Sequence, residues 1–202
     1  MVEKVDLKKE LDSFRAKQGE LRIITVPDRR YLMVDGEGDP NTSPAFTAAI
    51  EALYPVAYRL KFASKRELGR DYVVPPLEGL WWAEDMASFT TARDKAQWSW
   101  TLMIMVPDWI EEAITVASIG EAGAVRLATL SEGQCVQTLH VGSFDDEAPV
   151  LERMHHEFIP GNGLRMVGRH HEIYLSDFRR VAPERRRTIL RQPVVPDDTS
   201  AG

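Results

Sequence analysis

The sequence predicts an α+β protein in which a strand–helix–strand arrangement occurs twice. Each half contains segments whose apolar residues recur at helical spacing, and these are flanked by runs rich in β-branched and aromatic residues. Gly, Pro and Asp cluster between the segments, where turns are expected. With 202 residues, 44% of them apolar, the chain is long enough to bury a substantial core.

The first half opens with a short amphipathic helical extension, expected within residues 1–20. Strands are predicted at 21–26 and 31–34, followed by a loop rich in Gly, Asp and Pro. A Ser-Pro pair then favours a helix over about 44–62, because Pro is well suited to the first helical position. Pro55 is expected to kink this helix or to shorten it by a turn. Three further strands are predicted at 72–74, 78–82 and 98–106.

The second half repeats the plan. A helix is predicted from 108 to about 130 with an interruption at two glycines, then a strand at 135–141, a helix at 147–158 and a strand at 170–175. Residues from 191 onward are expected to be frayed. The predicted organisation is therefore an extension at 1–20, one domain at 21–192 with pseudo-repeats at 21–107 and 108–192, and a flexible tail at 193–202.

Composition excludes several classes of protein. The net charge of −6 argues against a general nucleic-acid binder, which needs an excess of Lys and Arg. The lone Cys135 excludes an internal disulfide framework and fits a reducing cytoplasm. The longest apolar run, 102–106, is too short to span a bilayer, and the N-terminus lacks the apolar stretch of a secretory signal. We expect a cytoplasmic protein with neither a nucleic-acid nor a membrane partner.

The tryptophans are unevenly distributed, since all five lie between positions 81 and 109. On a strand at 98–106, Trp98 and Trp100 share one face; on the preceding strand Trp82 and Trp81 point to opposite faces. One interpretation is that these indoles fill the core. The other is that they form a pocket for flat or cationic organic ligands, which bind by stacking and cation–π contact. The pattern favours neither.

Acidic and histidine residues offer candidates for chemistry. Glu172 shares a strand face with Tyr174, so it lies either on a solvated face or in a cavity, where it could accept a proton from water. Glu78 is a weaker second acid. The sequence His-His-Glu occurs at 155–157 and at 170–172, but adjacent histidines on a strand point to opposite faces and no His-Glu-x-x-His spacing is present. We therefore expect no metal site.

Four segments carry motifs in a recognisable order. They read YLMVDGEGDPN at 31–41, PPLEGLWW at 75–82, CVQTLHVG at 135–142 and HHEIYLSD at 170–177. Together they resemble the stand-alone bacterial branch of the GyrI-like small-molecule-binding proteins, over about residues 3–193. The resemblance implies a duplicated strand–helix–strand–strand (SHS2-type) module with a cleft between the copies. That cleft would take up bulky, often cationic or aromatic, compounds.

Within that family the chain is similar to the cyclopropanoid cyclopropyl hydrolases. They open the cyclopropane of DNA-alkylating natural products of the yatakemycin and CC-1065 type by adding water, which gives cellular protection and antibiotic self-resistance. The resemblance implies an aromatic cage and no cofactor. Carried over, it draws the cage from Trp82, Trp98, Trp100, Tyr72 and Tyr174, with Glu172 as the pocket acid. We take Glu172 and Tyr72 as the catalytic candidates. The substrate-binding candidates are Trp82, Trp98, Trp100 and Tyr174, to which the sequence adds Tyr54, Trp81 and His170. The alternative is a non-catalytic protein that binds or sequesters small molecules.

Overall fold

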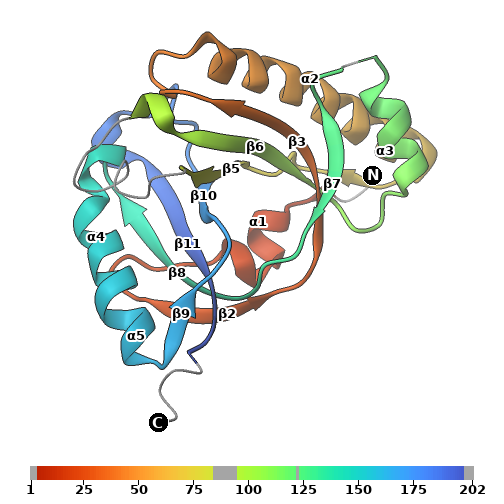
Figure 1. Cartoon of the computed structure of the whole chain (residues 1–202). Coiled ribbons are helices and arrows are strands. Elements are labelled where there is room, and N and C mark those ends of the chain that lie inside the picture. Colours follow the sequence, from red (N-terminus) through yellow and green to blue (C-terminus); the bar gives the residue numbers. More distant parts are fainter. Residues whose placement is uncertain (1–3, 84–94, 122, 198–202) are drawn as a thin grey trace. The chain divides into compact units, whose positions relative to one another are not determined.

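The chain folds into two compact units, each built on a set of antiparallel strands that is here called the sheet of that unit (Figure 1). The computed structural model describes residues 4–83, 95–121 and 123–197. Of these residues, the first unit takes up 4–12, 29–83, 95–121 and 123–130, and the second takes up 13–28 and 131–197. Mixed helices and antiparallel sheet confirm the predicted α+β class, whereas duplication of one module stays a prediction. The pseudo-repeats at 21–107 and 108–192 also stay a prediction. Residues 22–26 pair with β8 (Gly133–Val141) of the second unit, and residues 126–130 pair with β3 (Arg29–Glu37) of the first.

The sheet of the first unit has the strand order β5-β6-β3-β7. Its strands are β3 (Arg29–Glu37), β5 (Leu77–Trp82), β6 (Ser99–Val106) and β7 (Arg126–Leu130). A short parallel pair, β1 (Lys4–Val5) with β4 (Asp71–Tyr72), lies outside this sheet. The predicted helical extension is thus only partly helical: after β1 come α1 (Leu7–Glu10) and a 3₁₀ turn at Asp12–Phe14.

Helix α2 (Pro44–Glu67) lies along one face of β3 and β6 (Figure 1). Its buried side includes Leu53 and Leu60, which are 0% and 1% exposed. The helix continues past Pro55 and runs further than predicted. Pro55 lies on the exposed side, where the carbonyl that loses its intrahelical hydrogen bond can be hydrated. Gly69, at φ +64°, follows the end of the helix.

The predicted helix over 108–130 is wrong in its second half. Helix α3 spans only Glu112–Ile119, and Gly120 at φ +56° ends it. The chain then returns as β7, which pairs antiparallel with β3 from Arg29–Leu130 to Met33–Arg126. A glycine with positive φ stops a helix because a left-handed backbone position cannot continue the right-handed turn.

The sheet of the second unit has the order β2-β8-β11-β10, and β9 pairs with the far end of β11. Its strands are β2 (Arg22–Val26), β8 (Gly133–Val141), β9 (Leu164–Met166), β10 (His170–Tyr174) and β11 (Arg187–Pro196). The residues from 191 were predicted to be frayed, but β11 runs to Pro196 and lies between β8 and β10. Pairing with β8 as far as Pro193 and with β9 from Val194 to Pro196 explains why this proline-containing segment is ordered. Residues 198–202 lie outside the described residues.

One continuous helical segment covers a face of this second sheet. It consists of α4 (Ala148–Glu152), a π-helical turn (Arg153–Phe158) and α5 (Ile159–Gly161). Met154 and Ile159 from this segment pack with Val136 of β8 and Leu190 of β11 in one buried cluster. The face of the sheet that carries Leu190 is therefore the helix-covered face.

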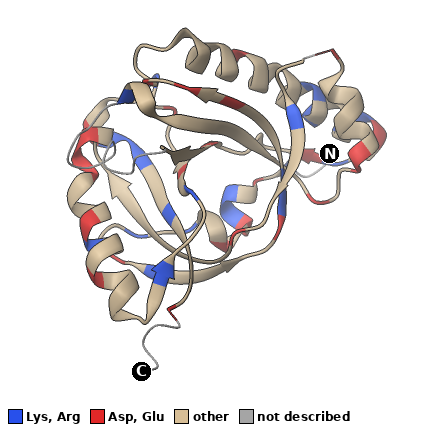
Figure 2. Cartoon of the chain, viewed as in Figure 1, with Lys and Arg blue, Asp and Glu red and all other residues tan. Residues whose placement is uncertain are grey.

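Charged residues of both signs are interspersed along the described helices and strands (Figure 2). A protein that binds nucleic acid generally gathers its Lys and Arg on one face instead. No described helix combines the length and the apolar character that crossing a membrane requires.

Candidate functional site

The second unit brings together three of the predicted site residues on one face of β10. The hydroxyl of Tyr174 donates a hydrogen bond to Oε2 of Glu172 at 2.8 Å. Nε2 of His170 lies 3.6 Å from Oε1 of the same carboxylate, and the two side chains are only 15% and 14% exposed. The alternation expected for a strand places these residues together. The Glu172 carboxylate thus accepts a hydrogen bond from a phenol and lies close to an imidazole.

This carboxylate lies on the helix-covered face of the sheet. Glu172 is in register with Leu190, whose side chain packs under the helical segment. From the π-helical turn, His155 contacts His170 edge to face, with 6.3 Å between ring centroids. Burial, together with the neighbouring His170 and His156, lowers the pKa of His155 to about 4. His155 is therefore neutral at neutral pH. A π-turn is a frequent feature of functional sites.

Aromatic rings lie beside the carboxylate. Tyr174 contacts Phe178 and Phe144 at centroid separations of 5.2 and 5.8 Å, and these two phenylalanines contact each other at 5.8 Å. The guanidinium of Arg186 lies 5.3 Å from the centre of the Phe144 ring. Sequence reasoning missed both phenylalanines and His155. Phe178 follows Tyr174 by four residues, but only the fold brings Phe144 and His155 to the strand.

In the first unit, a second aromatic cluster forms around Phe46 of α2. Its ring stacks on Trp81 at 6.0 Å and meets Trp100 edge to face at 5.2 Å. Trp81 and Trp100 are directly opposite each other on β5 and β6, and Trp98 meets Trp81 at 5.9 Å. Trp82 is the next residue along β5, so its side chain leaves the opposite face of the sheet. The structure therefore groups Trp81, Trp98 and Trp100 and sets Trp82 apart.

Within this cluster Trp100 has the role of a core residue. It is 0% exposed, and its indole N–H donates to the Gly38 carbonyl at 3.3 Å. Trp81 is 6% exposed and Trp98 is half-buried. The core interpretation therefore holds for Trp100. Trp98 is partly exposed, and for it the ligand-pocket interpretation stays a prediction.

Tyr72, predicted as catalytic, lies in the first unit on β4. It is 2% exposed and meets Trp109 edge to face at 5.9 Å. Lys61 Nζ lies 5.8 Å from the Tyr72 ring. Burial, reinforced by the charge of Asp71, raises the pKa of Tyr72, so its phenol stays protonated across the physiological range. Tyr54 is half-buried on α2, and the weaker acid Glu78 is 1% exposed on β5.

The arrangement of the described His, Cys, Asp and Glu side chains bears on metal binding and thiol chemistry. Within residues 4–83, 95–121 and 123–197, no group of three His, Cys, Asp or Glu side chains is arranged to hold a metal ion. Cys135 is 0% exposed, and burial is the main cause that raises the pKa of its thiol to about 12. A thiol in that state is a poor nucleophile.

Comparisons with known proteins agree with this architecture. The family model of the GyrI-like small molecule binding domain matches residues 19–194. An uncharacterized conserved protein from Listeria innocua is 38% identical over 95% of this chain and 100% of its own, with a TM-score of 0.84.

Two hydrolases from Listeria innocua are each 36% identical to the chain. The first covers 96% of this chain and 100% of its own with a TM-score of 0.83, and the second covers 95% and 100% with a TM-score of 0.80. A search of curated proteins found no match. From the family match over most of its length and these relatives, the chain belongs to the GyrI-like small molecule binding domain family.

Proposed function

We propose that this protein binds bulky planar aromatic molecules and hydrolyses the cyclopropane of DNA-alkylating cyclopropanoids of the yatakemycin and CC-1065 type. The observation that carries the proposal is the partly buried Glu172 carboxylate, which accepts a hydrogen bond from Tyr174 beside a cluster of aromatic rings. Membership of a small-molecule-binding family and the likeness to two hydrolases support it.

The reaction adds one molecule of water across a strained carbon–carbon bond. In such compounds the cyclopropane is conjugated to a dienone. The water oxygen forms a bond to a ring carbon, the cyclopropane bond breaks, and its electron pair moves into the dienone to give a phenolate. One water proton goes to a base, and the phenolate takes up a proton to become a phenol. The driving forces are the release of strain and the formation of an aromatic ring.

Glu172 is the base in this proposal. The hydrogen bond from Tyr174 to Oε2 fixes the carboxylate, and Oε1 is then the oxygen that orients and deprotonates the water. A fixed base and a stacked substrate lower the barrier because the reacting groups are already in place. His170, which lies 3.6 Å from Oε1, is proposed to contact the substrate beside the base.

Aromatic residues are proposed to bind the flat drug by stacking. These are Tyr174, Phe144 and Phe178 of the second unit. In the first unit, Trp81, Trp98 and Trp100 stay predicted ligand contacts. Trp82 and Tyr54 stay predicted ligand contacts. Tyr72 stays a predicted proton donor to the phenolate, which its protonated state allows.

The test is to incubate the purified protein with a CC-1065-type cyclopropanoid and to measure the water adduct by liquid chromatography and mass spectrometry. Glu172→Gln removes the proposed base, so it should slow hydrolysis by roughly 100-fold or more, because general-base catalysis raises a reaction rate by about 10²–10⁴-fold. Binding, followed by quenching of tryptophan fluorescence, should change little. Tyr58→Phe, on the exposed side of α2, is the control.

Two outcomes contradict the proposal. An adduct that forms no faster than in buffer means that the protein is not a hydrolase of this compound, and quenching without adduct then identifies a non-catalytic binder. Hydrolysis at the wild-type rate by Glu172→Gln means that another residue is the base.

A further inference from the structure

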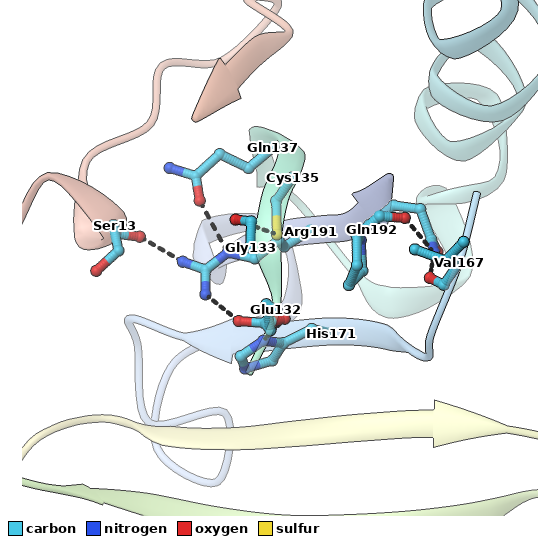
Figure 3. A network of polar contacts seen from close by, with 10 residues as sticks. Ser13, Glu132, Gly133, Cys135, Gln137, Val167, His171, Arg191 and Gln192 are labelled. Atoms are coloured by element: carbon cyan, nitrogen blue, oxygen red, sulfur yellow. Dashed lines mark hydrogen bonds and ion pairs between the residues drawn. The ribbon is translucent and has the colours of Figure 1, made fainter. Parts of the chain in front are cut away.

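Arg191 lies buried in the middle of β11, on the sheet face opposite Glu172. It is 1% exposed, and its guanidinium donates in three directions (Figure 3). Nε donates to Gln137 Oε1 at 3.0 Å, Nη1 to Glu132 Oε2 at 3.0 Å and Nη2 to the Ser13 carbonyl at 2.6 Å. A buried guanidinium with partners on all sides has one allowed position.

Glu132 connects this arginine to β10. Its second oxygen, Oε1, lies 2.8 Å from Nδ1 of His171, and the two side chains are 3% and 0% exposed. Burial raises the pKa of Glu132, but the charges and hydrogen bonds of His171 and Arg191 outweigh it and hold that pKa at about 2. The carboxylate is thus ionised at neutral pH, and it faces the strand at the position of His171.

A shift of β10 by a single residue would change which of its side chains faces Glu132. His171 is opposite Arg191 on β11, and Glu172 is opposite Leu190. Because side chains alternate along a strand, a slip of one residue would turn the whole set to the other face. A slip in one direction brings Glu172 to the Glu132 carboxylate, where two negative charges would share a buried site. A slip in the other direction brings His170 opposite Arg191, but it also buries the Glu172 carboxylate opposite Ile189, which costs free energy.

We propose that the Glu132–Arg191 pair, together with the buried apolar position 189, selects the register of β10. The pair accepts the imidazole of His171 and rejects the carboxylate of Glu172, and the apolar position 189 opposes the slip that would bring His170 to the pair. This selection holds His170, Glu172 and Tyr174 on the opposite, helix-covered face. His171 is then a positioning residue for the hydrolysis, and that catalytic consequence rests on the proposed function. The selection also accounts for the order of His171 and Glu172 along the strand.

The experiment compares His171→Leu with His171→Gln. Leu cannot donate to Glu132, so a second set of β10–β11 cross-strand nuclear Overhauser effects is expected, and kcat on the CC-1065-type cyclopropanoid should fall roughly ten-fold with KM changed less than about two-fold. The Gln side chain carries an amide donor. It should therefore restore the single register, which pairs residue 171 with Arg191, and most of kcat.

Ile189→Ala is the matched control, because it removes buried packing on the same sheet face without touching the network. It should lower Tm and leave both the register and kcat unchanged. Equal losses of kcat in Ile189→Ala and His171→Leu would overturn the inference, as would a single native register in His171→Leu.

Glu172→His provides a test that leaves the buried network intact and is scored by register alone. It removes the repulsion against a slip, so two registers are expected, and one native register would count against the selection. If His171→Leu does not fold, the register of Glu172→His tests the inference in its place. If the wild-type protein has no hydrolytic activity, the proposed function is overturned. The register measurements do not depend on activity, so they would still test the inference.

Discussion

The indole of Trp100 lies directly against the backbone of Gly36 on the neighbouring strand. The two residues are in register on β6 and β3, and a Cβ built on Gly36 would overlap the six-membered ring of the indole. Gly36 does not need a positive φ here; what the position requires is the absence of a side chain. This contact explains how Trp100, the largest of the fully buried side chains in the described residues, fits within the sheet.

Gly36→Ala should therefore destabilise the protein. The added methyl group forces the indole or the strand to move, and overpacking of this kind costs about 1–3 kcal/mol. Urea unfolding followed by circular dichroism measures the loss. Gly161→Ala is the control, because Gly161 lies in α5 with no atom near its would-be Cβ, and Ala favours a helix. Equal stability of Gly36→Ala and wild type would mean that the contact is not close.

Tyr174→Phe should reduce hydrolysis without abolishing it. The variant keeps the ring that contacts Phe144 and Phe178 but loses the hydroxyl that fixes Glu172. We expect kcat to fall by roughly ten-fold, the scale of one lost positioning hydrogen bond, with binding of the cyclopropanoid unchanged. Steady-state kinetics and fluorescence quenching measure the two effects. Weaker binding at unchanged kcat would instead make the hydroxyl a ligand contact.

The free energy of unfolding should decrease as the pH is lowered, because Glu132 becomes protonated. Its pKa is about 2 in the folded protein against an ordinary value of 4.5, so the ionised carboxylate stabilises the fold above pH 4.5 and this stabilisation is lost as the pH falls toward 2. The difference corresponds to about 3 kcal/mol at full loss. Urea unfolding at pH 7, 4 and 3 should show the decline. Glu132→Gln should be less stable at pH 7 and show a flatter decline.

His155 should cause an earlier decline, between pH 6.5 and 4. The unfolded chain binds a proton at the ordinary histidine pKa, whereas the folded protein resists protonation until about pH 4, so acid favours unfolding across that window. His155→Gln should flatten this part of the profile. His156→Gln is the matched control, since the His156 side chain is 62% exposed. Identical profiles for His155→Gln and wild type would contradict a buried neutral imidazole.

Local signals were sufficient for much of the fold. The strands β8 and β10 and the start of α2 were predicted from alternation, β-branched residues and the Ser-Pro pair, and the structure has them. The alternation on β10 also correctly placed Glu172 and Tyr174 on one face. These features depend on residues that are close together in the sequence, and for that reason the sequence pattern was enough.

Other features depend on partners far away in the chain. From the sequence, the segment at 126–130 is predicted as the continuation of a helix. In the structure it is a strand, because it pairs with the edge of β3. The grouping of Trp81 rather than Trp82 with Trp100 follows from the register of β5 on β6, which the spacing of tryptophans leaves open. Likewise Phe144, from a 3₁₀ turn, and His155, from the π-helical turn, contact residues of β10, and nothing near them in sequence indicates that contact.

The three-way connection of Arg191 has a consequence for how this sequence can diverge. A substitution that removes Glu132 alone leaves a buried guanidinium without its counter-charge, and breaking a buried pair in this way costs about 3–5 kcal/mol. Replacement of all the charged members by apolar residues together avoids that cost. We therefore expect positions 132, 171 and 191 to change together among descendants of this chain. No single substitution converts the charged network into the apolar one without breaking the buried pair.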